Sequence, residues 1–320
     1  MLTRREFGLC LSWAGALAMP RSALAQKIMR YVVPFAPGGA TDIVARLLND
    51  QLSQRLGLPV IVDNRSGAGG LIGTRLVVQS PPDGSTILGA SFNFLLYPVL
   101  FKDLDFDIQK DLAPVSLVAI YPSVLVVHPT SPFKSVRDVV DYAKQNPGKL
   151  QFASSGIGTA AHIAGELLKR DAKVEMVHVP YRGGGPANAD VVAGHVAMHF
   201  ANIGSAMQFV RSGQMRPLAV AMPKRIASLP DVPTMIEAGY PDFIINEFQG
   251  ILTARGTPPD IVQRLNAEIV GILRDPVMRE KFAQMGGEMV ASSPNQFADF
   301  IRSDSERWIA VARETGVKGE

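Results

Sequence analysis

Apolar and polar residues follow one another in blocks that predict strands and helices in turn. Short apolar runs typical of buried strands occur at residues 28–33, 59–62 and 86–90. Between them, segments 41–56 and 71–79 carry apolar residues at helical spacing on one face. The order strand, helix, strand, helix, strand predicts a parallel sheet with helices on its faces.

The same alternation begins again in the second third of the chain. Two strand-like runs, 114–119 and 123–127, flank Tyr121-Pro122, which we interpret as a crossing between two domains. The later strands are expected at 150–153, 174–179, 196–200 and 217–221, and the later helices at 136–145, 160–169, 186–193, 259–273, 276–285 and 294–314. The last three helices have no sheet of their own, so we expect the C-terminal segment to return and cover the first domain.

These elements predict an α/β protein of two lobes with a ligand cleft between them. Residues 26–123 and 245–320 are assigned to lobe 1, and residues 124–244 to lobe 2. Ligands of open α/β sheets sit at the carboxyl ends of strands. We therefore expect the cleft where the chain crosses from one lobe to the other. Such an arrangement is typical of a protein that closes on its ligand by hinge bending.

The first residues are typical of an export signal. Arg4-Arg5 precedes an apolar stretch at 7–19, and Ala23-Leu24-Ala25 supplies a small-x-small cleavage pattern. Residues 1–25 are therefore predicted to be a signal peptide cut near Ala25-Gln26, which would place the mature protein in the periplasm. The arginine pair indicates a twin-arginine signal, and an ordinary secretory signal with two arginines is the alternative.

Composition narrows the classes of function. The 320 residues include one cysteine, Cys10, which lies in the predicted leader, so the mature chain has no thiol for a disulfide, a nucleophile or a metal. The formal net charge of +3 falls to about +1 without the leader, and no basic cluster indicates nucleic acid. His195 and His199 are four residues apart, but His199 lies in the predicted strand 196–200, whose extended backbone sets the two residues roughly 13 Å apart, so no metal site is expected.

Two glycine-containing turns, each between a strand and a helix, are the candidate ligand site. The first spans residues 35–42 and the second residues 154–162. Because the free backbone N–H groups of a helix N-terminus bind anions, two such turns facing one another would hold a small carboxylate. The candidate ligand-binding residues in the two turns are Phe35, Ala36, Gly38, Gly39, Thr41, Asp42, Ser154, Ser155, Gly158, Thr159 and His162.

Each residue type suggests a role in these turns. Gly38 and Gly39 allow the backbone to approach a ligand closely, and Thr41 is expected to cap the helix. Asp42 is acidic beside an anion site, so we expect it to orient the loop or bond water. A well-capped turn without a ligand is the alternative. A hydrolase pairing Ser154 or Ser155 with His162 is disfavoured, because no G-x-S-x-G elbow is present.

The chain contains a further series of short motifs. These are Val33-Pro34-Phe35 with Pro37–Asp42, Asp63-Asn64-Arg65 with Gly67–Gly70, Pro82-Asp83-Gly84, Val126–Pro129, Ala143–Leu150, Gly156–His162 with Ala164–Leu167, His178–Tyr181, Leu229–Thr234, Gly256–Pro258 and Leu265–Glu268. In these motifs and their order the mature chain resembles the Bug family of periplasmic solute receptors, the TctC-like components of tripartite tricarboxylate transporters. The resemblance implies a type II periplasmic binding-protein fold and a carboxylated ligand held between loops 35–42 and 154–162.

The chain departs from the family at several positions near the expected cleft. The family commonly has an aspartate where this chain has Ala201, next to Asn202, and its loss argues against an amino-acid ligand. We therefore expect a plain dicarboxylate or monocarboxylate, aliphatic or aromatic. Ser91 and Phe92 end a strand beside the cleft, where Phe92 and Phe94 would pack on an apolar ligand body or in the core. Tyr181 either contacts the ligand or closes the hinge.

The predicted function is that of a monomeric, non-enzymatic receptor without cofactor or metal, which delivers its carboxylate to a membrane permease. One alternative is an orphan receptor that presents the ligand to a sensor kinase. Another is an α/β enzyme that uses the glycine turns for a phosphate-containing cofactor. The first turn lacks G-x-G-x-x-G spacing, and no P-loop Lys-Ser/Thr follows it, which disfavours the enzyme.

Overall fold

A three-stranded parallel sheet forms the centre of the first lobe. The computed structural model describes residues 28–319, and the predicted signal peptide with its cleavage site near Ala25-Gln26 lies outside them. The elements of this part are β1 (Met29–Val33), α1 (Ala40–Leu56), β2 (Val60–Asn64), η1 (Ala68–Gly70), α2 (Leu71–Val78), β3 (Thr86–Ser91), η2 (Phe92–Leu96) and α3 (Tyr97–Leu100). Strand β1 pairs in parallel with β2 and with β3, as the alternation of elements predicts.

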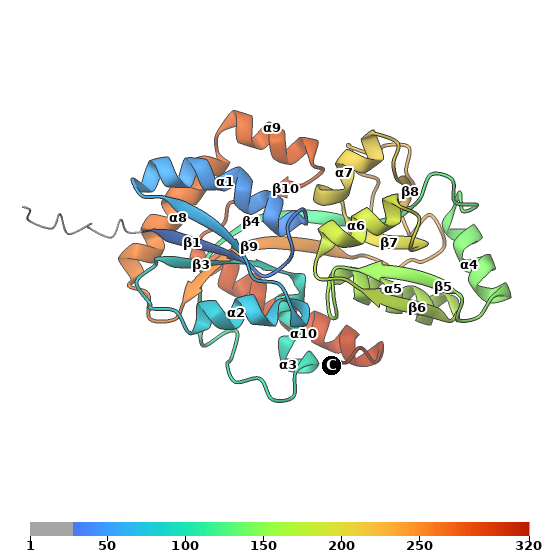
Figure 1. Cartoon of the computed structure of the whole chain (residues 1–320), viewed down its shortest axis with the longest axis horizontal. Coiled ribbons are helices and arrows are strands. Elements are labelled where there is room, and N and C mark those ends of the chain that lie inside the picture. Colours follow the sequence, from blue (N-terminus) through green and yellow to red (C-terminus); the bar gives the residue numbers. More distant parts are fainter. Residues whose placement is uncertain (1–27, 320) are drawn as a thin grey trace, which may run out of the picture.

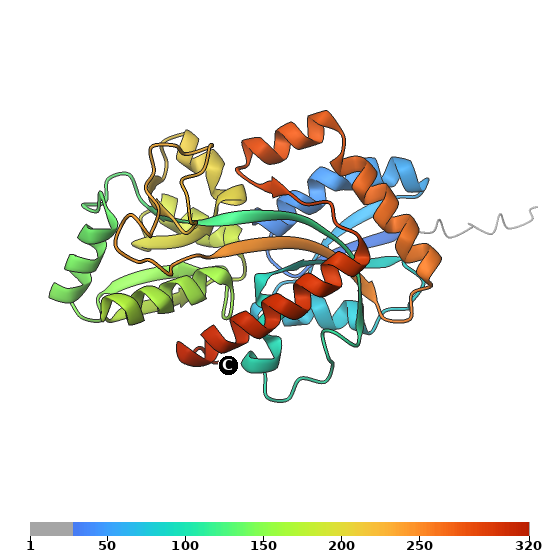
Figure 2. The ribbon, with the colours of Figure 1, turned by 180° about the vertical axis from the view of Figure 1, so that it is seen from behind.

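Two long antiparallel strands, β4 (Leu112–Val127) and β9 (Asn246–Ala254), run from the first lobe to the second (Figures 1 and 2). The prediction of two separate strands around Tyr121-Pro122 is wrong, because β4 is continuous through them. Pairing with β9 ends at Pro122 and pairing with β7 begins at Ser123. The missing N–H of the proline therefore falls between two ladders, where a strand tolerates it.

The second lobe is built on strands that share β4 with the first. Its elements are α4 (Val136–Gln145), β5 (Leu150–Ser154), α5 (Ala160–Ala172), β6 (Met176–Pro180), α6 (Gly184–Val192), β7 (Met198–Asn202), α7 (Ile203–Arg211) and β8 (Arg216–Val220). Strand β5 is parallel to β6 and β7, whereas β7 and β8 are antiparallel to β4. The sheet path is β2-β1-β3-β9-β4-β7-β5-β6.

The C-terminal segment returns to the first lobe, as the lack of a sheet for its helices predicts. It comprises α8 (Pro259–Leu273), α9 (Pro276–Gln284), β10 (Glu288–Met289) and α10 (Pro294–Glu314). Helix α8 lies beside α1, where Arg55 forms a 3.5 Å ion pair with Glu268. Helix α10 crosses behind β4 and β9 in Figure 1, and its last turn reaches α5 of the second lobe. There Arg170 lies 3.3 Å from Glu314.

The hydrophobic core consists of two layers, one on each face of the shared sheet. Alternate residues of β4 feed the two layers, since successive side chains of a strand point to opposite faces. Leu125 and Val127 belong to one layer and Val124 and Val126 to the other. Within residues 28–319, no helix combines the length and the apolar character needed to cross a membrane.

Candidate functional site

The two lobes meet around a small cavity beside the crossing strands. It is lined by Phe35, Gly39, Ala40, Thr41, Ser91, Phe92, Asn93, Ser155, Thr159, Ala160, Gly184, Asn202, Ser205 and Glu247. The first turns of α1 and α5 reach it from opposite lobes, and the crossing strand β9 contributes Glu247. Its volume of about 20 Å³ is room for roughly one water, so this is a closed arrangement that must open to admit a ligand.

The cavity contains part of each predicted turn. The predicted residues that line it are Phe35, Gly39, Thr41, Ser91, Phe92, Ser155, Thr159 and Asn202. The other lining residues were not named as ligand-binding residues from the sequence: Ala40, Asn93, Ala160, Gly184, Ser205 and Glu247. Ala40 and Ala160 are the first residues of α1 and α5, so the turn pattern itself was the signal for them. Glu247 had no such signal, because strand β9 was not predicted.

Glycine backbones from both lobes touch across the mouth of this cavity. The N–H of Ala36 donates a 2.8 Å hydrogen bond to the carbonyl of Arg182. A Cβ built on Gly38 would lie 3.5 Å from Gly185 Cα, and one built on Gly185 would overlap the carbonyl oxygen of Pro37. The close approach of the lobes therefore requires glycine at 185, whereas a Cβ at Gly38 would make only an ordinary van der Waals contact. Gly38 is suited to glycine by its backbone, which has a φ of +86°.

Asp42 holds the first turn in shape. Its Oδ2 accepts hydrogen bonds from the N–H of Gly38 and from Arg46 Nε, each 3.0 Å, and its Oδ1 accepts one from Asn64 Nδ2 at 2.9 Å. Burial raises the pKa of Asp42, but these bonds outweigh burial and the pKa is lowered below its usual range. Asp42 does not line the cavity, and its carboxylate oxygens bond to residues in and around the first turn instead.

The predicted cap of α1 is wrong. The helix begins at Ala40, one residue before the predicted start, and its N-cap is Gly39, which has no capping side chain. Thr41 therefore lies inside the first turn and presents its side chain to the cavity. In the same way, Thr159 is the N-cap of α5 without a side-chain cap bond, since its Oγ1 donates to the carbonyl of Gly156 at 2.7 Å.

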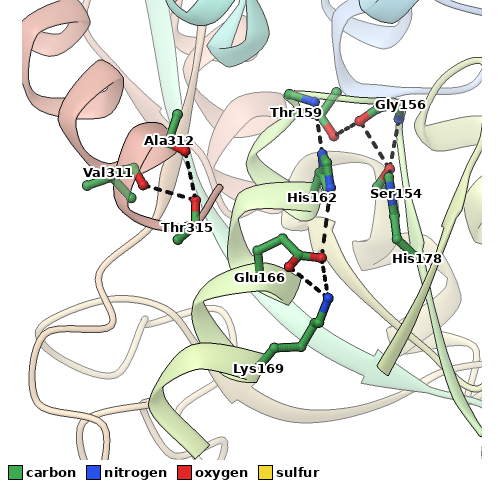
Figure 3. A network of polar contacts seen from close by, with 11 residues as sticks. Ser154, Gly156, Thr159, His162, Glu166, Lys169, His178, Val311, Ala312 and Thr315 are labelled. Carbon is green, nitrogen blue, oxygen red and sulfur yellow. Dashed lines mark hydrogen bonds and ion pairs between the residues drawn. The ribbon is translucent and has the colours of Figure 1, made fainter. Parts of the chain in front are cut away.

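The second turn uses many of its polar groups internally (Figure 3). Ser154 is fully buried, and its Oγ accepts a 3.1 Å bond from the N–H of Gly156 and lies 2.6 Å from His178 Nε2. The N–H of Gly158 donates to His162 Nδ1 at 3.1 Å. Ser154, Gly158 and His162 were expected to face the ligand, but they do not line the cavity because these bonds turn them into the loop.

His162 and His178 form a stacked pair beneath this turn. Their ring centroids are 3.8 Å apart and the planes differ by 9°. Burial lowers the pKa of His162 to about 3, with smaller contributions from the charges of His178 and Lys169. Burial likewise lowers the pKa of His178 to about 4. Both rings are neutral near pH 7, and Ser154 pairs with His178 rather than with His162, the partner that the hydrolase alternative required.

Four other predicted residues lie away from the cavity. Ala36 uses its N–H in the bond between the lobes, and Ala201 is fully buried in β7 opposite Val124. The hydroxyl of Tyr181 donates to Asp190 at 2.6 Å, and Phe94 packs edge-on against Tyr97 in the core. Phe92 does line the cavity, where its ring rests edge-on against Trp308 of α10.

A wider hollow adjoins the cavity between the lobes. It has a volume of about 750 Å³, shares Phe35 and Ser155 with the cavity, and includes Tyr181 and Arg182. Its other wall is the glycine-rich segment 66–72 of the first lobe. Because it opens beside the bond between Ala36 and Arg182, we interpret it as the entrance on the solvent side.

The charge of the cavity comes from a single residue. Among the described lining residues, Glu247 alone is ionisable, and none is lysine or arginine. Burial raises the pKa of Glu247 to about 7, and the nearby amide of Asn202 lowers it in part. Asn202 Nδ2 has no partner of ordinary hydrogen-bond geometry among residues 28–319, whereas its Oδ1 accepts from the N–H of Gly204 at 2.8 Å.

The fold and the cavity together define a class of protein. Two α/β lobes joined by crossing strands, with opposed helix N-termini in the cleft, form a type II periplasmic binding protein. A family model described as the tripartite tricarboxylate transporter family receptor matches residues 44–317. The chain therefore belongs to this receptor family, the Bug family of solute-binding proteins, as its motifs indicate.

Solved structures of similar proteins agree with this assignment. The periplasmic binding protein BugD is 32% identical with a TM-score of 0.87, over 91% of this chain and 98% of that chain. The structure of R. palustris Rpa4515 with adipate is 32% identical with a TM-score of 0.87, over 90% and 97%. The structure of MatC from Rhodopseudomonas palustris with bound malate is 31% identical with a TM-score of 0.85, over 89% and 98%.

Proposed function

We propose that this protein is a periplasmic receptor that captures a small organic carboxylate in the cavity between its lobes. The ligand is a dicarboxylate or a monocarboxylate, and a tripartite tricarboxylate-type permease takes it up. The observation that carries the proposal is the convergence of two helix N-termini, one from each lobe, on one cavity. The adipate and malate in the structures of Rpa4515 and MatC support this ligand class.

The helix N-termini offer free backbone donors. The first intrahelical bond of α1 is donated by Ile43 to the carbonyl of Gly39, so the N–H groups of residues 40–42 have no acceptor within the helix. In α5 the first such bond is donated by Ile163 to the carbonyl of Thr159, so the N–H groups of residues 160–162 have no acceptor within the helix. Both sets lie at the positive end of a helix dipole, where an anion is stabilised.

The donors are numerous enough for tight binding without lysine or arginine. A hydrogen bond to a charged group contributes about 1.5–3 kcal/mol. Four such bonds therefore approach the roughly 8 kcal/mol of a micromolar complex. Donors from both lobes act together only when the lobes are closed, so ligand binding stabilises closure.

The proposed lobes are residues 26–123 with 245–320, and residues 124–244. The boundaries fall where β4 and β9 cross from one lobe to the other. We infer that the lobes open by bending of these strands, because the closed cavity has room for only about one water.

Titration calorimetry on the mature protein tests the proposal. The panel comprises adipate, malate, succinate, benzoate and, as an amino acid, glutamate. We expect one carboxylate to bind with 1:1 stoichiometry. The variant Ala40→Pro removes one amide donor at the first helical position, which tolerates proline, and Gly39 already has the extended backbone that precedes a proline. It should weaken binding at least tenfold, and a folded protein that binds no carboxylate would overturn the proposal.

The partner is tested separately in cells. Uptake of the labelled ligand should require both this receptor and the membrane components of a tripartite tricarboxylate transporter. If uptake continues without those components while a transcriptional response to the ligand is lost with the receptor, presentation to a sensor kinase replaces transport as the function.

A further inference from the structure

The cavity proposed to bind an anion has an acidic residue in its wall. Glu247 is the second residue of β9, opposite Tyr121 on β4, at the point where the crossing strands leave the first lobe. Its side chain is partly buried and lines the cavity together with Asn202 and Ser205. A carboxylate ligand in this cavity must therefore meet a protein carboxyl group.

Within residues 28–319, no cationic side chain contributes to the pKa of this carboxyl group. The elements that line the cavity, and β4 beside it, carry these other ionisable residues: Tyr121 on β4, His199 on β7, Asp42, Arg46, Asp50 and Arg55 on α1, His162, Glu166, Lys169, Arg170 and Asp171 on α5, Asp190 on α6 and Arg211 on α7. Arg182 lies in the turn before α6. None of these contributes a charge to the pKa of Glu247, whose shift to about 7 is caused by burial and the amide of Asn202. Burial also keeps His199 and Tyr121 neutral, by lowering the pKa of the first to about 3 and raising that of the second.

The amide of Asn202 lies at the same wall of the cavity. Asn202 is 7% exposed, and its Nδ2 has no hydrogen-bond partner of ordinary geometry within residues 28–319, although the amide is close enough to Glu247 to lower the pKa of that carboxyl. Ser205 donates from its Oγ to the carbonyl of Asn202 at 3.1 Å and accepts from Asn188 Nδ2 at 3.2 Å. The hydroxyl of Ser205 is thus occupied, so the groups left for a ligand at this wall are the amide of Asn202 and the carboxyl of Glu247.

We propose that Glu247 binds the ligand in its protonated form and donates a hydrogen bond to a ligand carboxylate, so that capture of the ligand takes up one proton. The inference rests on the proposed function and specifies how its site selects a ligand. Two carboxylates at such close range cannot both remain ionised in a buried site, whereas a carboxyl and a carboxylate share one proton favourably. A bound carboxylate therefore raises the pKa of Glu247 further.

This arrangement selects against ligands with an ammonium group. An ionised Glu247 would instead attract a cation, as in an amino acid, and would bind such a ligand more tightly as the pH rises. Protonated Glu247 favours plain carboxylic acids, which agrees with the absence of an acid at Ala201. The two modes predict opposite dependences of affinity on pH, and this separates them by experiment.

Calorimetry in HEPES and in Tris, from pH 6 to pH 9, measures the coupling. We use the tightest-binding acid of the panel of adipate, malate, succinate and benzoate. The difference in binding enthalpy between the two buffers at pH 8 should correspond to uptake of nearly one proton. Because only protonated Glu247 binds, Kd should rise about a hundredfold from pH 6 to pH 9. In the ligand-free protein, carbon-13 NMR should show Glu247 titrating near pH 7.

Two variants locate the proton. Glu247→Gln keeps a donor of similar shape, so it should bind with a Kd that changes little between pH 6 and pH 9 and without proton uptake. Glu288→Gln, at an exposed acid of β10, is the matched control and should retain the wild-type profile. Absence of binding at every pH overturns the proposed function and this inference with it. Binding without proton uptake, or a pH profile that persists in Glu247→Gln, overturns this inference alone.

Discussion

The N–H of Ala36 and the carbonyl of Arg182 are 2.8 Å apart in a hydrogen bond that joins the two lobes. Both residues belong to turns that precede helices, and both turns contain glycines that meet at the same place. A single backbone bond contributes only about 1 kcal/mol. This bond alone is therefore too weak to hold the lobes together, and under the proposed function a bound ligand would add to the stability of the closed state.

Gly185→Ala should hold the lobes open. A Cβ at this position would overlap the carbonyl of Pro37 in the other lobe, while its own lobe offers no such obstruction. Alanine is also the better residue inside a helix, by about 1 kcal/mol, so the second lobe should remain folded. We expect the Kd for the carboxylate to rise at least tenfold and small-angle X-ray scattering to show a larger radius of gyration with ligand present.

The control for this variant is Gly271→Ala. Gly271 is also inside a helix, and the nearest atom to its Cβ is the end of the flexible Arg55 side chain. It should leave both Kd and radius of gyration unchanged. Normal closure of Gly185→Ala would show that the contact between the two glycine turns is not required for the closed state.

Ser154 and Ser155 are neighbours with different roles, and alanine variants should separate them. Ser154→Ala leaves His178 Nε2 and the N–H of Gly156 without partners, so the free energy of unfolding should fall by about 1–3 kcal/mol. Its Kd should stay within about twofold, since Ser154 does not line the cavity. Ser155→Ala should do the reverse, with weaker binding and unchanged stability. Chemical denaturation and calorimetry on the same samples measure both effects.

The stacked histidines should make the protein sensitive to acid. His162 and His178 have pKa values lowered to about 3 and about 4, below the unfolded value of about 6.5. The unfolded chain thus binds more protons between these limits, and the free energy of unfolding should fall as the pH drops from 6.5 toward 4. The loss is on the order of 2–3 kcal/mol for each histidine. The variant His162→Gln should show a smaller loss over this range in urea unfolding, and an equal loss would contradict the prediction.

Asp42→Asn should weaken the first turn in a manner that depends on pH. The folded state lowers the pKa of Asp42, so its carboxylate stabilises the protein above the unfolded pKa of about 3.9. This stability is lost as the pH falls through the lower folded value. We expect the free energy of unfolding of the wild type to exceed that of the variant by about 1–3 kcal/mol at pH 7 in urea unfolding, and this difference to shrink below pH 4. If the difference in free energy of unfolding stays constant from pH 7 to pH 3, the negative charge of Asp42 does not contribute to the stability of the turn.

The order of most elements and the location of the two turns can be read from the amino-acid pattern alone. Apolar periodicity predicted α1 and β5 closely, because period 3.6 and period 2 are local properties of a segment. It missed β9, whose first residues, Asn246 and Glu247, are polar, because Glu247 faces the cavity and breaks the apolar pattern of a buried strand. It divided β4 at Pro122, because a proline interrupts a strand unless its position lies between two ladders.

Which residues of the turns face the cavity depends on contacts between distant parts of the chain. Ser154 and Ser155 are chemically identical and adjacent in sequence, but one bonds inside its loop and the other lines the cavity. The approach of Gly38 to Gly185 and the position of Glu247 depend on pairings between distant strands. Local sequence specifies how a segment folds. The pairing of β4 with β9 specifies which other segments it contacts, and these contacts determine the chemistry of the cavity.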